Sequence, residues 1–230
     1  FINNKKFNGL TEIVYSKDKL NYNFSFRNNS LKINSPEAKN TNFNLDSEIQ
    51  LSPFYFKGEL IIKNKKVESI IDNLLINLLM YDENYLNNVN GELKIKFKDL
   101  NNKLIKNGEI DLIVNDKKIN LIEARFDLDK IGYIKTELSF SEIQGELKFI
   151  AKNRLIIENH IEFAKIFQIS SKKIKNINQM DFDIEKDLGD NNFIISNIKI
   201  DNKENKNSSS EVFLVKNIQN LRSYIRKVID

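Results

Sequence analysis

The stretch Gly91-Glu92-Leu93-Lys94-Ile95-Lys96-Phe97-Lys98 decides the fold, because apolar and charged residues alternate along it without a break. Successive side chains of a β-strand point to opposite faces, so this stretch predicts a strand with one apolar and one charged face. Gly-Glu-Leu or Gly-Glu-Ile also occurs at Gly58, Gly108 and Gly145, although the chain has only seven glycines. The spacings of 33, 17 and 37 residues are near multiples of about 17 to 18, or two strands and two turns, which is typical of a repeated β unit.

The same alternation predicts strands on both sides of this stretch. Residues 1–62 read as strands, with an Asn28-Asn29 turn and with Pro53 at a strand start or edge. Residues 89–200 read as an antiparallel meander, with a turn at Asn107-Gly108 and a switch of parity at Ile122-Glu123 that indicates a bulge. The predicted fold class is therefore mainly β with a few short helices, built on an elongated, curled, groove-like antiparallel sheet.

Three segments have the apolar spacing of a helix instead. An apolar stripe over 66–80 predicts a helical insertion at 63–88, with Asn64 as N-cap. Asn159 followed by Glu162 resembles a capping box and predicts a short helix near 160–168. A polar loop at 201–210 precedes a last strand and a C-terminal helix within 211–230. We expect these helices at the ends of the sheet or on its apolar face.

The composition excludes several classes of function. Of the 230 residues 40% are apolar and 30% charged, and the 36 basic and 32 acidic groups are interleaved, with a net charge of +4. This pattern predicts a solvated face and no nucleic-acid partner. The absence of cysteine excludes a disulfide, a thiol nucleophile and a cysteine-bound metal. The most apolar run, from Ile70 to Met80, is too short and too interrupted to span a bilayer.

Candidates for catalysis are few, and each has a simpler structural interpretation. His160 is the only histidine and falls in the first turn of a predicted helix, where packing is the favoured interpretation. Asp181 and Asp183 share the charged face of one strand and make no glycosidase or metal arrangement. The acidic segment 187–192 lacks the ligand spacing of a calcium loop and predicts a turn. We therefore predict a non-enzymatic protein without cofactor or metal.

The repeated Gly-Glu-Leu/Ile strand openings, together with the ending Asn217-Ile218-Gln219-Asn220-Leu221-Arg222-Ser223-Tyr224-Ile225-Arg226, resemble the C-terminal region of the AsmA-like family of bacterial envelope proteins. The resemblance covers residues 54–230. It implies a curled β-sheet with an apolar groove, held in the periplasm by an inner-membrane anchor. It further implies phospholipid transport between the inner and outer membranes, a role in outer-membrane biogenesis and outer-membrane assembly proteins as partners. Because the chain starts at Phe1 instead of Met, we expect the anchor outside this segment.

If the apolar side of the sheet exceeds what the short helices can cover, the remainder is a surface for phospholipid acyl chains. The alternative is a closed β-sandwich, a structural or interaction module of the cell envelope whose apolar side is ordinary core. Under the first hypothesis, headgroups would contact Arg222, Arg226 and Lys227. The residues predicted to line the groove are Leu93, Ile95, Phe97, Ile110, Leu112, Val114, Leu138, Phe140, Leu147 and Phe149.

Overall fold

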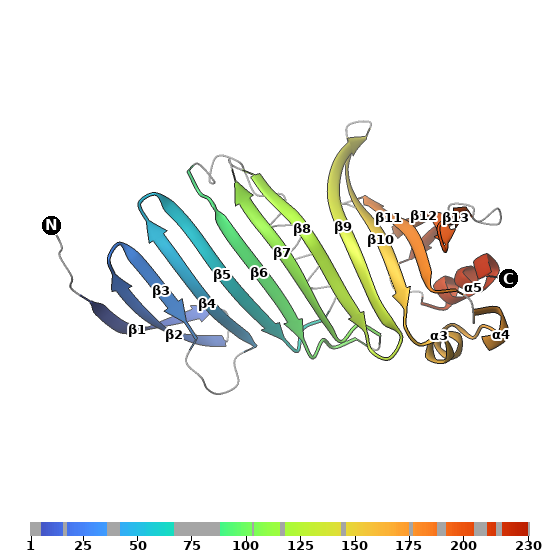
Figure 1. Cartoon of the computed structure of the whole chain (residues 1–230), viewed down its shortest axis with the longest axis horizontal. Coiled ribbons are helices and arrows are strands. Elements are labelled where there is room, and N and C mark those ends of the chain that lie inside the picture. The colour runs from blue at the N-terminus through green and yellow to red at the C-terminus, as the bar shows by residue number, and fades with distance from the viewer. Residues whose placement is uncertain are drawn as a thin grey trace. The chain divides into compact units, whose positions relative to one another are not determined.

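The computed structural model is mainly β, and all of its described strands belong to one sheet (Figure 1). The chain divides into two compact units, Phe1–Glu123 and Ala124–Asp230. The residues that the structure describes are 6–15, 18–35, 42–66, 88–102, 104–115, 118–143, 146–174, 177–187, 192–204, 211–214 and 218–229.

Strands follow one another along the sheet in the order of the sequence. The described part holds a 14-stranded sheet ordered β1 to β13, with β14 paired to β12. In the first unit the strands are β1 (Phe7–Tyr15), β2 (Asp18–Arg27), β3 (Ser30–Asn34), β4 (Phe43–Leu51), β5 (Phe54–Lys63), β6 (Gly91–Lys98) and β7 (Asn107–Asn115), and β8 (Lys118–Leu128) runs across the division. The second unit continues with β9 (Gly132–Ile143), β10 (Glu146–Ile157), α3 (His160–Phe167), α4 (Ser171–Ile174), β11 (Gln179–Asp187), β12 (Asn192–Ile200), β13 (Lys203–Glu204), β14 (Glu211–Leu214) and α5 (Ile218–Ile229).

The prediction of a mainly β fold on one open antiparallel sheet with few helices is confirmed. The pairing of β5 with β6 is an exception, since these two strands run parallel. A parallel pair needs a crossover connection, which residues 64–90 provide. The predicted helix at 66–80 lies almost wholly outside the described residues. Asn64 is not its N-cap, because Asn64 has a φ of 55° and Lys65 and Lys66 are not helical.

The registers in the first unit bring apolar positions of neighbouring strands into line. Leu45 of β4 lies opposite Leu60 of β5, which lies opposite Ile95 of β6. Ile95 in turn lies opposite Ile110 of β7. Side chains in such a row point to the same side of the sheet. We call this side the apolar face and the opposite side, which carries the intervening residues, the charged face.

Three glycines of the repeats, Gly58, Gly91 and Gly108, lie on the apolar face within strands, whereas Gly145 lies outside the described residues. Gly58 lies in the middle of β5, Gly91 begins β6, and Gly108 is the second residue of β7. Gly91 pairs with Phe56, and a Cβ at position 91 would overlap the carbonyl oxygen and the ring of Phe56. Phe97 likewise lies opposite Gly108. Glycine at these positions thus leaves room for an aromatic side chain of the next strand.

Only some of the turns in the structure lie where the sequence predicts them. Asn28 and Asn29 both have positive φ, as a tight hairpin turn requires, and they connect β2 and β3 as predicted. The prediction of a turn at Asn107-Gly108 is wrong, because both residues belong to β7. The connection between β6 and β7 is made by residues 99–106. The predicted loop 201–210 is interrupted by β13, since Asp201 and Asn202 form a second tight turn.

Strand β8 shows the predicted switch of parity. Ile119 and Leu121 are half-buried, whereas the consecutive residues Ile122 and Glu123 are exposed. From there the even-numbered positions are the inward ones, beginning with Ala124, which is fully buried. The division between the two units falls at the same point, after Glu123.

Helix α3 begins in the second unit where the sequence predicts. Asn159 is its N-cap, and its side chain accepts a hydrogen bond from the Glu162 amide at 3.1 Å. Phe163 and Phe167 form the buried side of the helix, with ring centroids 4.6 Å apart. The predicted C-terminal helix is present as α5, which buries Tyr224. Among the described residues no helix has the length and hydropathy needed to cross a membrane.

Candidate functional site

The apolar face differs in exposure along the first unit. On β6 and β7 most of it is closed to solvent, since Ile95 and Ile110 are both 0% exposed, and only Leu93 is half-buried among its described apolar side chains. On β1 to β5 Tyr22 and Ile62 are buried, most of the other side chains of this face are half-buried, and several are more open than that. Phe7, Leu51 and Phe54 are 50%, 44% and 37% exposed. The half-buried members are Phe24, Phe26, Leu31, Ile33, Leu45, Ile49, Phe56 and Leu60.

The residues predicted to line a groove are mostly buried side chains of β6, β7 and β10. Ile95, Phe97, Ile110, Leu112, Val114 and Phe149 are all at most 7% exposed. Leu93 and Leu138 are half-buried, and the side chains of Phe140 and Leu147 lie outside the described part. A ligand on the surface of the first unit would therefore meet the apolar residues of β1 to β5 before those of β6 and β7.

Sequence reasoning identified the strands of β2 to β5 but did not assign them to the candidate site. Their alternation was visible at Tyr22, Phe24 and Phe26, and again at Ile49 and Leu51. Periodicity cannot separate an apolar face that is covered from one that is open. The sequence signal that could have pointed to this region is its aromatic content, which includes Phe24, Phe26, Phe54 and Phe56.

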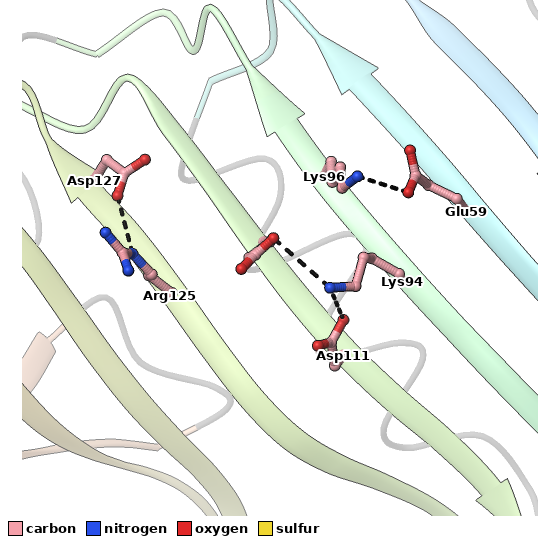
Figure 2. A network of polar contacts seen from close by, with 7 residues as sticks. Glu59, Lys94, Lys96, Asp111, Arg125 and Asp127 are labelled. Atoms are coloured by element: carbon pink, nitrogen blue, oxygen red, sulfur yellow. Dashed lines mark hydrogen bonds and ion pairs between the residues drawn. The ribbon is translucent and has the colours of Figure 1, made fainter.

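The charged face carries ion pairs between directly opposed strands. Lys94 lies opposite Asp111, with Nζ 3.2 Å from Oδ1, and 3.8 Å from Glu109 (Figure 2). Lys96 donates to Glu59 Oε2 at 2.7 Å. Such exposed pairs each contribute about 0.2 to 1 kcal/mol. In the second unit Arg125 pairs with Asp127 at 3.2 Å and lies over the Tyr133 ring, 3.9 Å from its centroid.

These contacts shift the ionisation of several groups on the charged face. The Tyr55 hydroxyl donates to Glu92 at 2.9 Å, and this bond, with nearby Lys57, holds the pKa of Glu92 below its ordinary value. The same bond raises the pKa of Tyr55. The hydrogen bond to Asp111 raises the pKa of Lys94. Each shift favours the pairing seen in the structure, so these side chains act as structural partners.

The candidate catalytic groups also have structural roles. Asp181 accepts a hydrogen bond from Arg154 Nε at 2.7 Å, and Asp183 accepts one from Asn197 at 2.8 Å. Asp181 and Arg154 are opposed across β11 and β10, so the pair fixes the register of these strands. Within the described residues no group of three or more His, Cys, Asp or Glu side chains could hold a metal ion.

The three cations of α5 have different surroundings. Arg222 is half-buried, and its Nε is enclosed and has no hydrogen-bond partner among the described residues. Arg226 donates to the Ser223 hydroxyl at 3.3 Å within the same helix. Lys227 is exposed. Arg226 and Lys227 lie in the last turn, where cations are favourable to the helix dipole, so their presence has a local explanation.

The fold and this surface define a class of protein: a single antiparallel sheet with one apolar and one charged face. Comparison of the chain with protein-family models, with curated proteins and with solved structures finds no match. In the described residues the long strands pair edge to edge in one sheet, and two facing sheets of a closed β-sandwich are not formed.

Proposed function

We propose that this chain holds phospholipid acyl chains on its apolar face, as a segment of an AsmA-like protein that transports phospholipid between the inner and outer bacterial membranes. The observation that supports the proposal is the apolar face of β1 to β5, on which most side chains are only half-buried. Monomeric soluble proteins rarely expose large continuous apolar patches without a function. Acyl chains gain about 0.8 kcal/mol per buried CH₂, so even a partly enclosed strip of this face would retain them.

In this proposal the protein is not an enzyme, and lipid movement along the face is passive. The acyl chains contact side chains such as Phe24, Ile49 and Phe56, while the headgroups remain at the polar ends of the strands. Because no bond is made or broken, no catalytic group or cofactor is required. The proposed location is the periplasm, tethered to the inner membrane, with outer-membrane assembly proteins as partners.

Lipid retention by purified variants tests the proposal. Ile49 and Gln50 are neighbours on β4. Ile49 is half-buried on the apolar face, whereas Gln50 is exposed on the charged face. After gentle purification, phospholipid bound to the wild type and to Ile49→Glu is measured by extraction and native mass spectrometry. We expect Ile49→Glu to retain roughly tenfold less lipid, because an ionised carboxylate on an acyl-binding surface has a large desolvation cost.

Gln50→Glu is the matched control, since it introduces the same charge one residue away. It should retain as much lipid as the wild type. Equal loss in both variants, or a wild type that carries no phospholipid at all, would contradict the proposal.

A further inference from the structure

Five lysines gather where β5 and β6 end, and their arrangement differs from that of the other lysines on the sheet. Lys63 and Lys98 are the last residues of these two parallel strands and lie directly opposite each other. Like charges in such a position destabilise a sheet. Several other lysines of the first unit face carboxylates, for example Lys57, which pairs with Glu92, and Lys94, which pairs with Asp111. At the ends of β5 and β6 two like charges therefore lie opposite each other.

The backbone holds the other three lysines beside this pair. The Asn64 amide donates to the Lys98 carbonyl at 3.2 Å, and the Asn101 amide donates to the Lys65 carbonyl at 2.9 Å. Lys66 follows directly in the chain. Lys106 closes the β6–β7 connection, because its carbonyl accepts from the Leu100 amide at 2.9 Å. We call Lys63, Lys65, Lys66, Lys98 and Lys106 the rim lysines.

None of the rim lysines forms an ion pair with a carboxylate within the described part of the chain. Lys106 donates to the Asn102 carbonyl oxygen at 2.8 Å, and Lys65 lies over the Phe43 ring at 4.8 Å. Among the described residues 63–66, 98–102 and 104–106, Asp99 is the one acidic residue. The ammonium groups of Lys66 and Lys98, both on exposed residues, are open to an anion from solution.

We infer that the rim lysines bind a phosphate-bearing anion. Lysine is a strong point-charge ligand for phosphate, and a cluster of lysines without carboxylates favours a polyvalent or repeated anion. Lys65 ties this cluster to the apolar face, because Phe43 belongs to the row of Ile62 and Phe97 on that face. The ligand that joins both chemistries is an anionic phospholipid. The assignment of the anion to a phospholipid rests on the proposed function, whereas the binding of a phosphate group by the rim lysines does not.

Vesicle binding tests the inference, with the full chain throughout. Co-sedimentation is measured with vesicles of phosphatidylcholine alone and of phosphatidylcholine mixed with phosphatidylglycerol. The wild type should prefer the anionic vesicles, and high salt should abolish that preference. K63Q/K65Q/K98Q should bind the anionic vesicles roughly 100-fold more weakly, since each basic residue near an anionic surface contributes a factor of about five. If the triple variant does not fold, K66Q/K98Q replaces it in the binding measurement, because both of its substitutions are at exposed residues.

The control variant K32Q/K57Q/K94Q removes the same charge from the ion-paired lysines of the same unit. It should keep the preference for anionic vesicles. Equal loss in the control and the rim variant would overturn the inference, because net charge alone would then explain the binding. So would a wild type that neither prefers anionic vesicles nor binds inorganic phosphate.

Titration with inorganic phosphate, followed by NMR of the backbone amides, distinguishes the two sources of the anion. Saturable shifts at the rim without vesicle preference would support the anion site and assign it to a soluble phosphate. Uptake of phosphatidylcholine acyl chains is measured in parallel. If that uptake is absent while the rim still binds phosphate, the proposed function fails and the anion site stands.

Discussion

Single glycines decide how closely neighbouring strands of this sheet approach. Gly9 pairs with Phe24 and Gly91 with Phe56, so in both places an aromatic side chain occupies the space that a Cβ would need. The glycine at position 91 of the Gly-Glu-Leu repeat is thus explained by packing on the apolar face, while the glutamates of the described repeats Gly58, Gly91 and Gly108 lie on the charged face. The glutamate and leucine positions could be predicted from period-two alternation. The role of the glycine could not, because it depends on which residue lies opposite in the next strand.

Gly91→Ala should destabilise the protein by about 2 kcal/mol, as overpacked substitutions in tight sites do. The added methyl group would overlap the Phe56 carbonyl, and backbone cannot move aside as a flexible side chain can. Thermal and denaturant unfolding give the measurement. Gly58→Ala is the control, because its nearest neighbours would lie 3.5 Å away in ordinary contact. Equal melting temperatures for the two variants would refute this account of the repeat.

The polar contacts of one residue pair lead to a prediction on pH. Tyr55 has a pKa raised above 10.0 by its bond to Glu92, so this contact stabilises the fold fully below the ordinary tyrosine pKa and is lost as pH rises through the folded value. The pKa of Glu92 is lowered from 4.5, so its contribution is present above that value and is lost as pH falls through the folded value.

Glu92→Gln should therefore lower the pKa of Tyr55 towards its ordinary value. The change is measured by titrating the tyrosine ring carbons by NMR. Glu109→Gln, which removes a carboxylate of the same face that pairs with Lys94 instead, should leave the Tyr55 titration unchanged. An unaltered Tyr55 titration in Glu92→Gln would mean that the hydrogen bond is not formed in solution.

At the scale of elements, local signals were reliable where the interaction itself was local. The cap at Asn159 and the Asn28-Asn29 turn were predicted because a few consecutive residues determine them. The parallel pairing of β5 and β6 was not predicted, since strand order across a long connection depends on contacts distant in the sequence. For the same reason Asn107-Gly108, a good hairpin signal, lies inside β7.

Asn159→Ala should cost about 1 kcal/mol of stability, because the Glu162 amide loses the side-chain oxygen that caps α3. Chemical denaturation gives the value. Asn159→Asp keeps an acceptor at the same place and should behave as the wild type. Ile161→Ala, at a side chain that is 73% exposed, should also be near neutral. A similar cost for all three would indicate that the loss does not arise from the cap.

At the scale of the whole molecule, the two faces of the sheet could be predicted from the sequence, but the exposure of each part of the apolar face could not. Alternation along the strands correctly gave a sheet with an apolar and a charged face. It could not tell that Ile95 and Ile110 are closed to solvent whereas Ile49 and Phe56 are half-buried. The exposure of an apolar side chain depends on the parts of the fold around it, and the pattern of a single strand contains no information about them.

The central claim is that the apolar face of β1 to β5 contacts acyl chains, and site-specific photo-crosslinking tests it most directly. A benzophenone amino acid is placed at Ile49 on the apolar face or at Gln50 on the charged face, and the protein is irradiated with phospholipid vesicles. The account predicts lipid adducts by mass spectrometry from position 49 and few from position 50. Adducts at equal yield from both positions, or from neither, would contradict it.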